Sequence, residues 1–267
     1  MFPVIHIGSI AFQVSGLFLI IGIWVGLTLT EKQSKTLGLK GEDVYNLVLV
    51  TLIATIIGAR AGFVLIYWKS FAPAPVNVLS LNPGLLDMRV GLLTGLVVGW
   101  IDIRLKRLPV WRTLDSLTPL LSVIGTALGV SHLATGAAYG IPAQVPWGIE
   151  LWGKIRHPTQ VYEIILAGII LGIILYVGRQ SQPRPAGFLS LLFIGLTAFE
   201  WLFLEGIRAE TSFFIGRYRG VQIIAWIILA SSLWGMSRLA RNEPHLGVNH
   251  GPGLYQKLIN SRNNRNQ

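Results

Sequence analysis

Long apolar runs alternate with short polar segments along the whole chain. Because a helix rises about 1.5 Å per residue, about 20 mostly apolar residues cross the hydrocarbon core of a bilayer. Runs of this kind predict seven transmembrane helices, over Ile10–Thr30, Val44–Tyr67, Leu85–Ile103, Leu117–Tyr139, Pro158–Val177, Ala186–Glu205 and Tyr218–Leu239. The third run is bounded by Arg89 and Asp102, and small or polar residues dilute the fourth. The pattern predicts an all-α integral membrane protein.

Composition agrees with this fold class and excludes several kinds of chemistry. Hydrophobic residues make up 52% of the chain and charged residues 13%, and the mean hydropathy is +0.59. The chain has no cysteine, which excludes disulfides, thiolate metal sites and lipidation of its own thiols. We expect neither a metal site nor a cofactor.

Basic residues predict the orientation in the membrane. Lys and Arg are more numerous in the segments after the first, third, fifth and seventh runs than in the other connections. Cytoplasmic loops of membrane proteins are enriched in Lys and Arg, so the N-terminus is predicted outside and the C-terminus in the cytoplasm. The net charge of +10 then reflects topology and attraction to anionic headgroups, and no nucleic-acid partner is expected.

The chain is predicted to hold one polytopic membrane domain and one tail. Residues 1–241 contain all the apolar runs, whereas residues 242–267 are polar and broken by Pro and Gly. That composition is typical of a flexible terminal segment. The tail is expected in the cytoplasm, on the side of the basic loops.

Polar residues fall at similar depths in several runs, always near the end predicted outside. They are Arg60, His132, Gln160, Glu163, Glu200, Glu205, Arg208 and Gln222. An ionisable group in the bilayer costs about 2.5 kcal/mol or more unless it pairs or faces water. Arginines exceed the nearby carboxylates, which favours a cavity for an anion, and the phosphate of a phospholipid suits the guanidinium fork. The alternative is that these groups only pair with one another between helices.

The stretch Arg156–Glu163, RHPTQVYE, places polar residues at the start of the fifth run. Proline is tolerated in the first turn of a helix, where its missing N–H has no partner. This predicts that a helix beginning near Pro158 holds Gln160, Tyr162 and Glu163 at the entrance of the cavity. An interfacial aromatic belt is the alternative for Tyr162 and the favoured interpretation for Trp147, Trp152 and Trp68.

Glycines recur every four residues in several runs, a spacing that lets two helices approach closely. The sets are Gly58 and Gly62; Gly91, Gly95 and Gly99; Gly125 and Gly129; and Gly168 and Gly172. Packing between helices is the favoured interpretation of all four sets, since the chain lacks a Gly-rich phosphate loop in an α/β context.

Several segments together resemble one bacterial family. They are PVIHIGSIAFQVSGLFLIIG, GARAGFVLIYW, MRVGLLTGLVVG, GAAYG, RHPTQVYE, GFLSLLFIGLTAFEWLFLEGIR and RGVQII. The chain resembles the phosphatidylglycerol:prolipoprotein diacylglyceryl transferases over nearly its whole length, and HPTQVYE with the upstream GARAGF is the most specific match.

The resemblance implies a function, partners and a location. Such an enzyme transfers a diacylglyceryl group from phosphatidylglycerol to the lipobox cysteine of a prolipoprotein, and glycerol phosphate leaves. The expected partners are this anionic phospholipid and the prolipoprotein, and the expected location is the bacterial plasma (inner) membrane, crossed many times. The residues that match family positions, and are therefore assigned to binding the lipid and its phosphate, are Arg60, His157, Gln160, Tyr162, Glu163, Glu205, Arg208 and Gln222. Arg89 is added to this set as a further arginine in excess of the nearby carboxylates.

The chain also departs from the family pattern. Ser15 stands where the family has Tyr, and Val90–Leu92 lacks its histidine. The family's Arg-x-Gly-Asn-Phe aligns with Gly129–Leu133, and the following Asn-x-Glu aligns with Thr135–Ala137. A further arginine of the family falls on Trp201, or on Glu200 if the register shifts by one residue. His132 could act as a base in a rearranged site beside Arg60 and Arg89; the favoured alternative is an intramembrane histidine whose hydrogen bonds are satisfied by its neighbours. Two hypotheses stay open: a divergent transferase, or a non-catalytic relative that holds a lipid or serves as an accessory subunit of a membrane complex.

Overall fold

The structure is a computed structural model that describes residues 4–7, 10–79, 83–180, 184–209, 213–215 and 218–242. Its long helices are α1 (Val14–Thr36), α2 (Gly41–Ile66), α4 (Met88–Leu105), α5 (Val110–Thr135), α6 (Thr159–Arg179), α7 (Phe188–Ile207) and α8 (Gly220–Asn242). Short helical segments α3 (Trp68–Phe71), η1 (Pro75–Leu79) and η2 (Pro83–Leu85) lie between α2 and α4. The predicted tail lies outside the described residues from position 243 onward.

Six described helices are long and apolar enough to cross a membrane: α1, α2, α5, α6, α7 and α8. The remaining long helix, α4, has only 18 residues and carries Arg89, Asp102 and Arg104. The structure thus supports an all-α membrane protein and coincides with six of the seven predicted spans.

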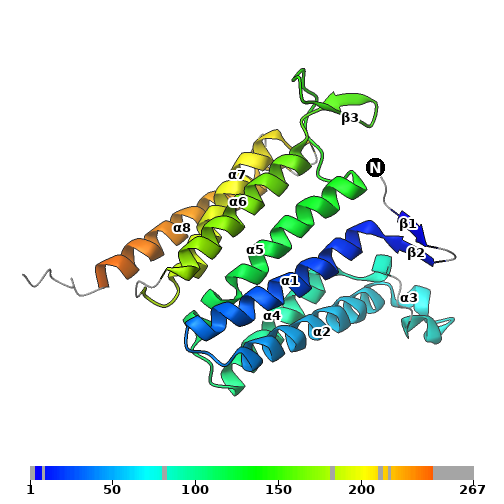
Figure 1. Ribbon diagram of the computed structural model, residues 1–267. Coiled ribbons are helices and arrows are strands. Elements are labelled where there is room, and N and C mark those ends of the chain that lie inside the picture. Colours follow the sequence, from blue (N-terminus) through cyan, green and yellow to red (C-terminus); the bar gives the residue numbers. More distant parts are fainter. Residues whose placement is uncertain are drawn as a thin grey trace, which may run out of the picture.

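The helices are arranged as a row in which α1 and α5 form the centre (Figure 1). On one side of this pair α2 packs against α1 and α4 packs against α2. On the other side α6 and α7 pack against α5, and α8 packs against α7. The row therefore has two lobes, and the α5–α6–α7 lobe is separated from the α2–α4 pair by α1.

Large apolar side chains cover the outer surface of the row. Trp24 is 70% exposed, Leu65 74% and Trp226 62%. In water such a surface would drive aggregation, whereas in a bilayer lipid tails cover it and only the backbone must be satisfied within each helix. This distribution identifies a protein whose helices face lipid.

Close helix contacts depend on some of the predicted glycines. A Cβ added at Gly91 would lie 2.7 Å from Ala59 Cβ and 2.8 Å from the backbone oxygen of Thr55, so α4 lies directly against α2. The prediction is wrong for Gly168 and Gly172, where an added Cβ would have nothing within 4 Å.

Two predicted span boundaries are wrong for physical reasons. Ile10 does not begin a helix, because Ile10–Gln13 forms β2 and pairs antiparallel with β1 (Val4–Ile7). The fourth span was predicted over Leu117–Tyr139, whereas α5 starts at Val110 after the N-cap Pro109. It ends at Thr135 because Gly136, at φ +74°, takes the left-handed conformation that stops a helix.

Two further hairpins connect consecutive helices. They lie on the side of the bundle where β1–β2 precedes the first residue of α1. Strands β3 (Ile149–Leu151) and β4 (Lys154–Arg156) pair antiparallel between α5 and α6, and this hairpin projects beyond the helix ends (Figure 1). Strands β5 (Phe213–Ile215) and β6 (Tyr218–Arg219) pair between α7 and α8.

On the opposite side of the bundle, where α5 and α7 begin, a buried carboxylate joins these two helices. Asp115, which is 4% exposed, accepts hydrogen bonds from Gly187 N (2.6 Å), Ser190 N (2.8 Å) and Ser190 Oγ (2.6 Å). These donors belong to the first turn of α7, so a carboxylate from another helix supplies its N-terminal cap.

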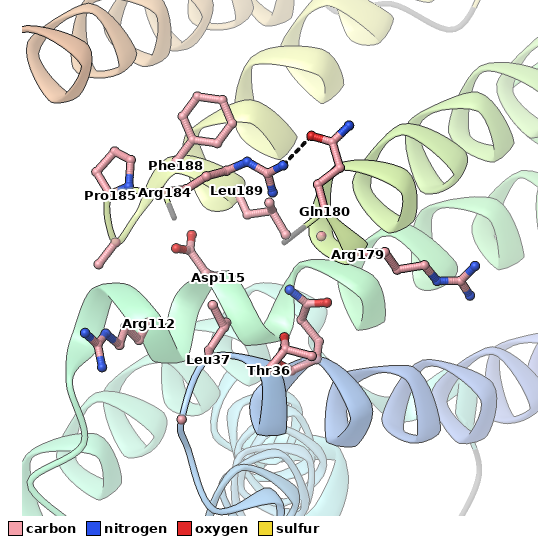
Figure 2. A pocket seen from close by; sticks show the side chains of 14 residues that line it. Thr36, Leu37, Arg112, Asp115, Arg179, Gln180, Arg184, Pro185, Phe188 and Leu189 are labelled. Carbon is pink, nitrogen blue, oxygen red and sulfur yellow. Dashed lines mark hydrogen bonds between the residues drawn. The ribbon is translucent and has the colours of Figure 1, made fainter. Parts of the chain in front are cut away.

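Asp115 lines a cavity of about 590 Å³ where α1, α5, α6 and α7 end or begin. Figure 2 shows Arg184 reaching Gln180, while Arg112 and Arg179 extend away from the cavity in opposite directions. Arg184 also donates to the carbonyl oxygen of Val177, so its charge is placed at the C-terminal end of α6. The polar groups of this cavity therefore mainly hold helix ends together.

Candidate functional site

A second cavity, of about 300 Å³, lies between α5, α6 and α7. Its walls are formed by Leu121, Ser122, Ile124, Gly125, Leu128, His132, Glu163, Ala167, Ile170, Phe193, Thr197, Glu200, Trp201 and Arg208. Along each helix the charged or titratable residues lie toward the end near the β3–β4 hairpin, and apolar residues lie deeper. A cavity with one polar and one apolar end suits an amphiphile, with its headgroup toward the hairpin end.

Three of the predicted residues meet at the polar end. Glu163 Oε2 lies 2.9 Å from His132 Nδ1 and 2.7 Å from Arg208 Nη2. The Glu163 side chain is only 13% exposed and that of Arg208 18%. One carboxylate from α6 thus joins the last turn of α5 to the residue that follows α7, in surroundings where charge-assisted hydrogen bonds are strong.

Arg208 keeps hydrogen-bonding capacity beyond its ion pair. Its Nε is buried and has no hydrogen-bond partner in the described part of the chain. A buried N–H without a partner costs free energy, so the described residues leave the Arg208 guanidinium incompletely satisfied, and Arg208 itself lines the cavity. Its assignment to binding a phosphate stays a prediction.

The backbone around Arg208 is held by the segment that follows α5. Arg208 forms an isolated bridge with Gly140, and Ala209 N donates to Tyr139 O at 3.0 Å. These contacts fix the end of α7 against the chain leaving α5. Arg208 is therefore placed by backbone pairing, independently of its ion pair.

The motif Arg156–Glu163 has two separate structural tasks. Thr159 and Gln160 are fully buried; Thr159 Oγ1 donates to Ala138 O at 2.6 Å and Gln160 Nε2 to Ala137 O at 2.9 Å. These bonds tie the start of α6 to the loop after α5. The structure thus places Gln160 behind the cavity wall, while Glu163, one turn later, faces the cavity.

His157 and Tyr162 form a cluster with Trp147 beside α6. Trp147 Nε1 donates to Tyr162 Oη at 2.6 Å, and His157 Nδ1 lies 3.4 Å from the same oxygen. Trp147 itself is 62% exposed. None of the three lines the cavity.

Arg60 is held by the connection between α2 and α4. Its guanidinium donates to three backbone oxygens, those of Val78 (2.8 Å), Leu85 (2.9 Å) and Asn77 (2.6 Å). It also lies 5.4 Å from the ring centroid of Phe71. Neither Arg60 nor Arg89 is among the residues that line the cavity of His132, and the rearranged site of the three stays a hypothesis.

The remaining predicted residues also lie outside the cavity wall. Arg89 is exposed in the first turn of α4, Glu205 is buried on α7, and Gln222 is half-buried in the first turn of α8. Their assignment to lipid binding, like that of Arg60, stays a prediction.

Sequence reasoning missed most of the wall. Phe193, Thr197 and Trp201 lie with the predicted Glu200 along one face of α7, at the helical spacing of four, three and one residues. Glu200 is 6% exposed. The signal that could have identified this face is the change from apolar to acidic residues along that stripe.

Comparison with known proteins gives the class of this chain. A family model described as prolipoprotein diacylglyceryl transferase matches residues 3–238. Membership follows from a match of this extent: the chain belongs to the prolipoprotein diacylglyceryl transferase family.

Relatives from several bacteria cover most of the chain. A phosphatidylglycerol–prolipoprotein diacylglyceryl transferase of Prochlorococcus marinus (strain NATL1A) is 26% identical over 88% of this chain and 89% of its own length. That of Clostridioides difficile (strain 630) is 27% identical over 79% and 84%. That of Bordetella parapertussis is 29% identical over 86% and 91%. The predicted family is thereby confirmed, as is the location in the bacterial inner membrane, which the apolar helices also support.

Proposed function

We propose that this protein transfers a diacylglyceryl group from phosphatidylglycerol to the cysteine thiol of an exported prolipoprotein. The observation that carries the proposal is the amphipathic cavity between α5, α6 and α7, whose polar end is lined by Arg208; the described residues offer no hydrogen-bond partner to its buried Nε. The names of the bacterial relatives supply the substrates.

In the proposed reaction the substrate supplies the nucleophile and the protein binds the phosphate group that leaves. The nucleophile is the thiolate of the prolipoprotein, which suits a chain that has no cysteine. The sulfur attacks the glyceryl carbon that carries the phosphate ester, a C–S bond forms, the C–O bond breaks, and glycerol phosphate leaves with the electron pair. Arg208 would hold the phosphodiester and stabilise the charge that develops on the departing oxygen.

We further propose seven membrane crossings with the N-terminus outside, α4 being the additional crossing. Basic residues at the cytoplasmic ends support this orientation, which puts the polar end of the cavity on the outer side, where an exported substrate arrives. Because the chain lacks cysteine, single cysteines placed at Glu42 and Trp152 can be labelled separately. An impermeant maleimide should label position 152 in intact spheroplasts and position 42 only after lysis; the reverse order would reject this topology.

The activity is tested with purified protein in vesicles of phosphatidylglycerol and a lipobox peptide. A thioether-linked diacylglyceryl peptide is the expected product, detected by mass spectrometry. Arg208→Gln should lower kcat/KM by about 100-fold or more, as is typical for loss of a group that stabilises developing charge. Arg238→Gln serves as the control, since this arginine near the end of α8 stacks on Trp234 away from the cavity. No product from the unaltered protein at high loading would reject the proposed reaction.

A non-catalytic lipid-holding role, alone or within a membrane complex, is the second candidate. The observation that favours it is the loss of charged family residues at positions such as Trp201, together with the engagement of Arg60 by backbone oxygens. Retained phosphatidylglycerol without any turnover of lipobox peptide would support this candidate over the first.

A further inference from the structure

The contact between His132 and Glu163 has the form of a catalytic dyad. His132 lies in the last turn of α5, its Nδ1 is 2.9 Å from Glu163 Oε2, and both side chains line the cavity. An imidazole that directs its Nδ1–H to a carboxylate leaves Nε2 free as a proton acceptor. The partner also fixes the orientation of the ring.

We propose that His132 is the base that removes the proton of the acceptor cysteine thiol, and that Glu163 is the positioning residue that orients it. This inference rests on the proposed transferase function and names the group that activates its nucleophile. The reacting sulfur comes from the substrate, so the full constellation of thiol, imidazole and carboxylate forms only when the prolipoprotein is bound.

The proton and electron balance of the step is complete without a further reactant. The thiol proton passes to His132 Nε2, and the thiolate forms the C–S bond as the ester C–O bond breaks. The phosphate oxygen leaves with the bonding electrons and receives the proton from the imidazolium. The imidazole is thereby returned to its starting state.

The other charged groups facing the cavity are less suited to this task. Glu163 already accepts hydrogen bonds from both His132 and Arg208, so its Oε2 lone pairs are occupied. Arg208 has no acceptor. Glu200, on α7, lines the same cavity and is the one competing base among the described cavity residues.

The test is the pH–rate profile of peptide lipidation in phosphatidylglycerol vesicles. His132→Asn should lower kcat at pH 7 by about 100-fold or more, the usual contribution of a general base, with KM for phosphatidylglycerol unchanged. Activity should recover toward pH 9, because the substrate thiol, with an ordinary pKa of about 8.5, then ionises unaided. Glu163→Gln should show the same alkaline recovery, and Glu150→Gln, at an exposed position outside the cavity wall, should retain the profile of the unaltered protein.

A peptide with selenocysteine in place of cysteine gives an independent readout. A selenol is more acidic than a thiol and needs no base at pH 7, so it should restore most of the lost rate of His132→Asn. A variant that merely misfolds would recover neither at alkaline pH nor with the selenol. A profile of His132→Asn that matches the unaltered protein would overturn the inference while leaving the transferase activity established, whereas absence of turnover in the unaltered protein would reject both.

Discussion

Arg60 Nε lies 2.8 Å from the carbonyl oxygen of Val78. This bond joins the C-terminal part of α2 to the connection that leads to α4, and the other two guanidinium nitrogens bind oxygens of the same connection. A planar guanidinium can serve three acceptors in fixed directions, which an ammonium cannot. Arg60 is therefore the element that orders this connection.

Arg60→Lys should loosen the segment between α2 and α4 while leaving the helices folded. Lysine keeps the charge but cannot meet all three carbonyl oxygens, so amide hydrogen exchange of residues 72–79 should accelerate by at least tenfold. Arg89→Lys is the matched control, since Arg89 is exposed. Unchanged exchange in Arg60→Lys would contradict the role assigned to its hydrogen bonds.

Asp115→Ala should destabilise the protein by about 2 kcal/mol. The substitution leaves three donors of the first turn of α7 without their acceptor, and loss of an N-terminal cap alone costs about 1–2 kcal/mol. Denaturant unfolding in detergent micelles measures the effect. Glu42→Ala, at an exposed position, should change the unfolding midpoint little; equal effects of the two substitutions would argue against the cap.

Gly91→Ala should separate α4 from α2. The added methyl would lie 2.8 Å from the backbone oxygen of Thr55, which cannot move aside as a flexible side chain could. Overpacking of this kind costs about 1–3 kcal/mol. Gly172→Ala is the control, because an added Cβ there meets nothing within 4 Å. Thermal unfolding of the two variants compares them directly, and equal midpoints would show that the contact between α2 and α4 is looser than described.

Ala167→Phe should obstruct the cavity between α5, α6 and α7. Ala167 is 5% exposed and belongs to the cavity wall, so a larger side chain there occupies the space proposed for the lipid. We expect retention of phosphatidylglycerol to fall at least tenfold. Ile169→Phe, on the lipid-facing surface of α6 where Ile169 is 53% exposed, should retain the lipid. Normal lipid retention by Ala167→Phe would place the binding site elsewhere.

Sequence patterns predicted the parts of the fold that depend on length and hydropathy alone. Six predicted spans coincide with described apolar helices, because crossing a bilayer imposes one length on every helix. Residues at equal depth on neighbouring helices come close, which is why His132, Glu163 and Arg208 could be grouped before the structure was known.

Contacts that depend on which helix faces which could not be predicted in this way. Gly22 and Gly168 both belong to pairs spaced by four residues, yet an added Cβ at Gly22 would lie 2.8 Å from Ala127 Cβ and one at Gly168 would be free. Spacing shows that a close contact is possible, and only the packing order of the helices decides where it forms.

The hydrogen-bond partners of polar side chains could not be predicted from the sequence either. Asp115 accepts a hydrogen bond from Ser190, which lies 75 positions later in the chain. Arg60 donates to backbone oxygens, which every residue has and which therefore leave no pattern in the sequence. An excess of arginine over acid predicted an anion site for the whole set, whereas Arg208 is the one arginine among the described residues that line the cavity between α5, α6 and α7.

The central claim is that the cavity between α5, α6 and α7 binds an anionic phospholipid through Arg208. Native mass spectrometry of protein extracted from membranes, compared with Arg208→Gln, tests it most directly. We predict that the unaltered protein retains phosphatidylglycerol in preference to phosphatidylethanolamine and that the variant loses this retained lipid. Equal retention of phosphatidylglycerol by both proteins would contradict the claim.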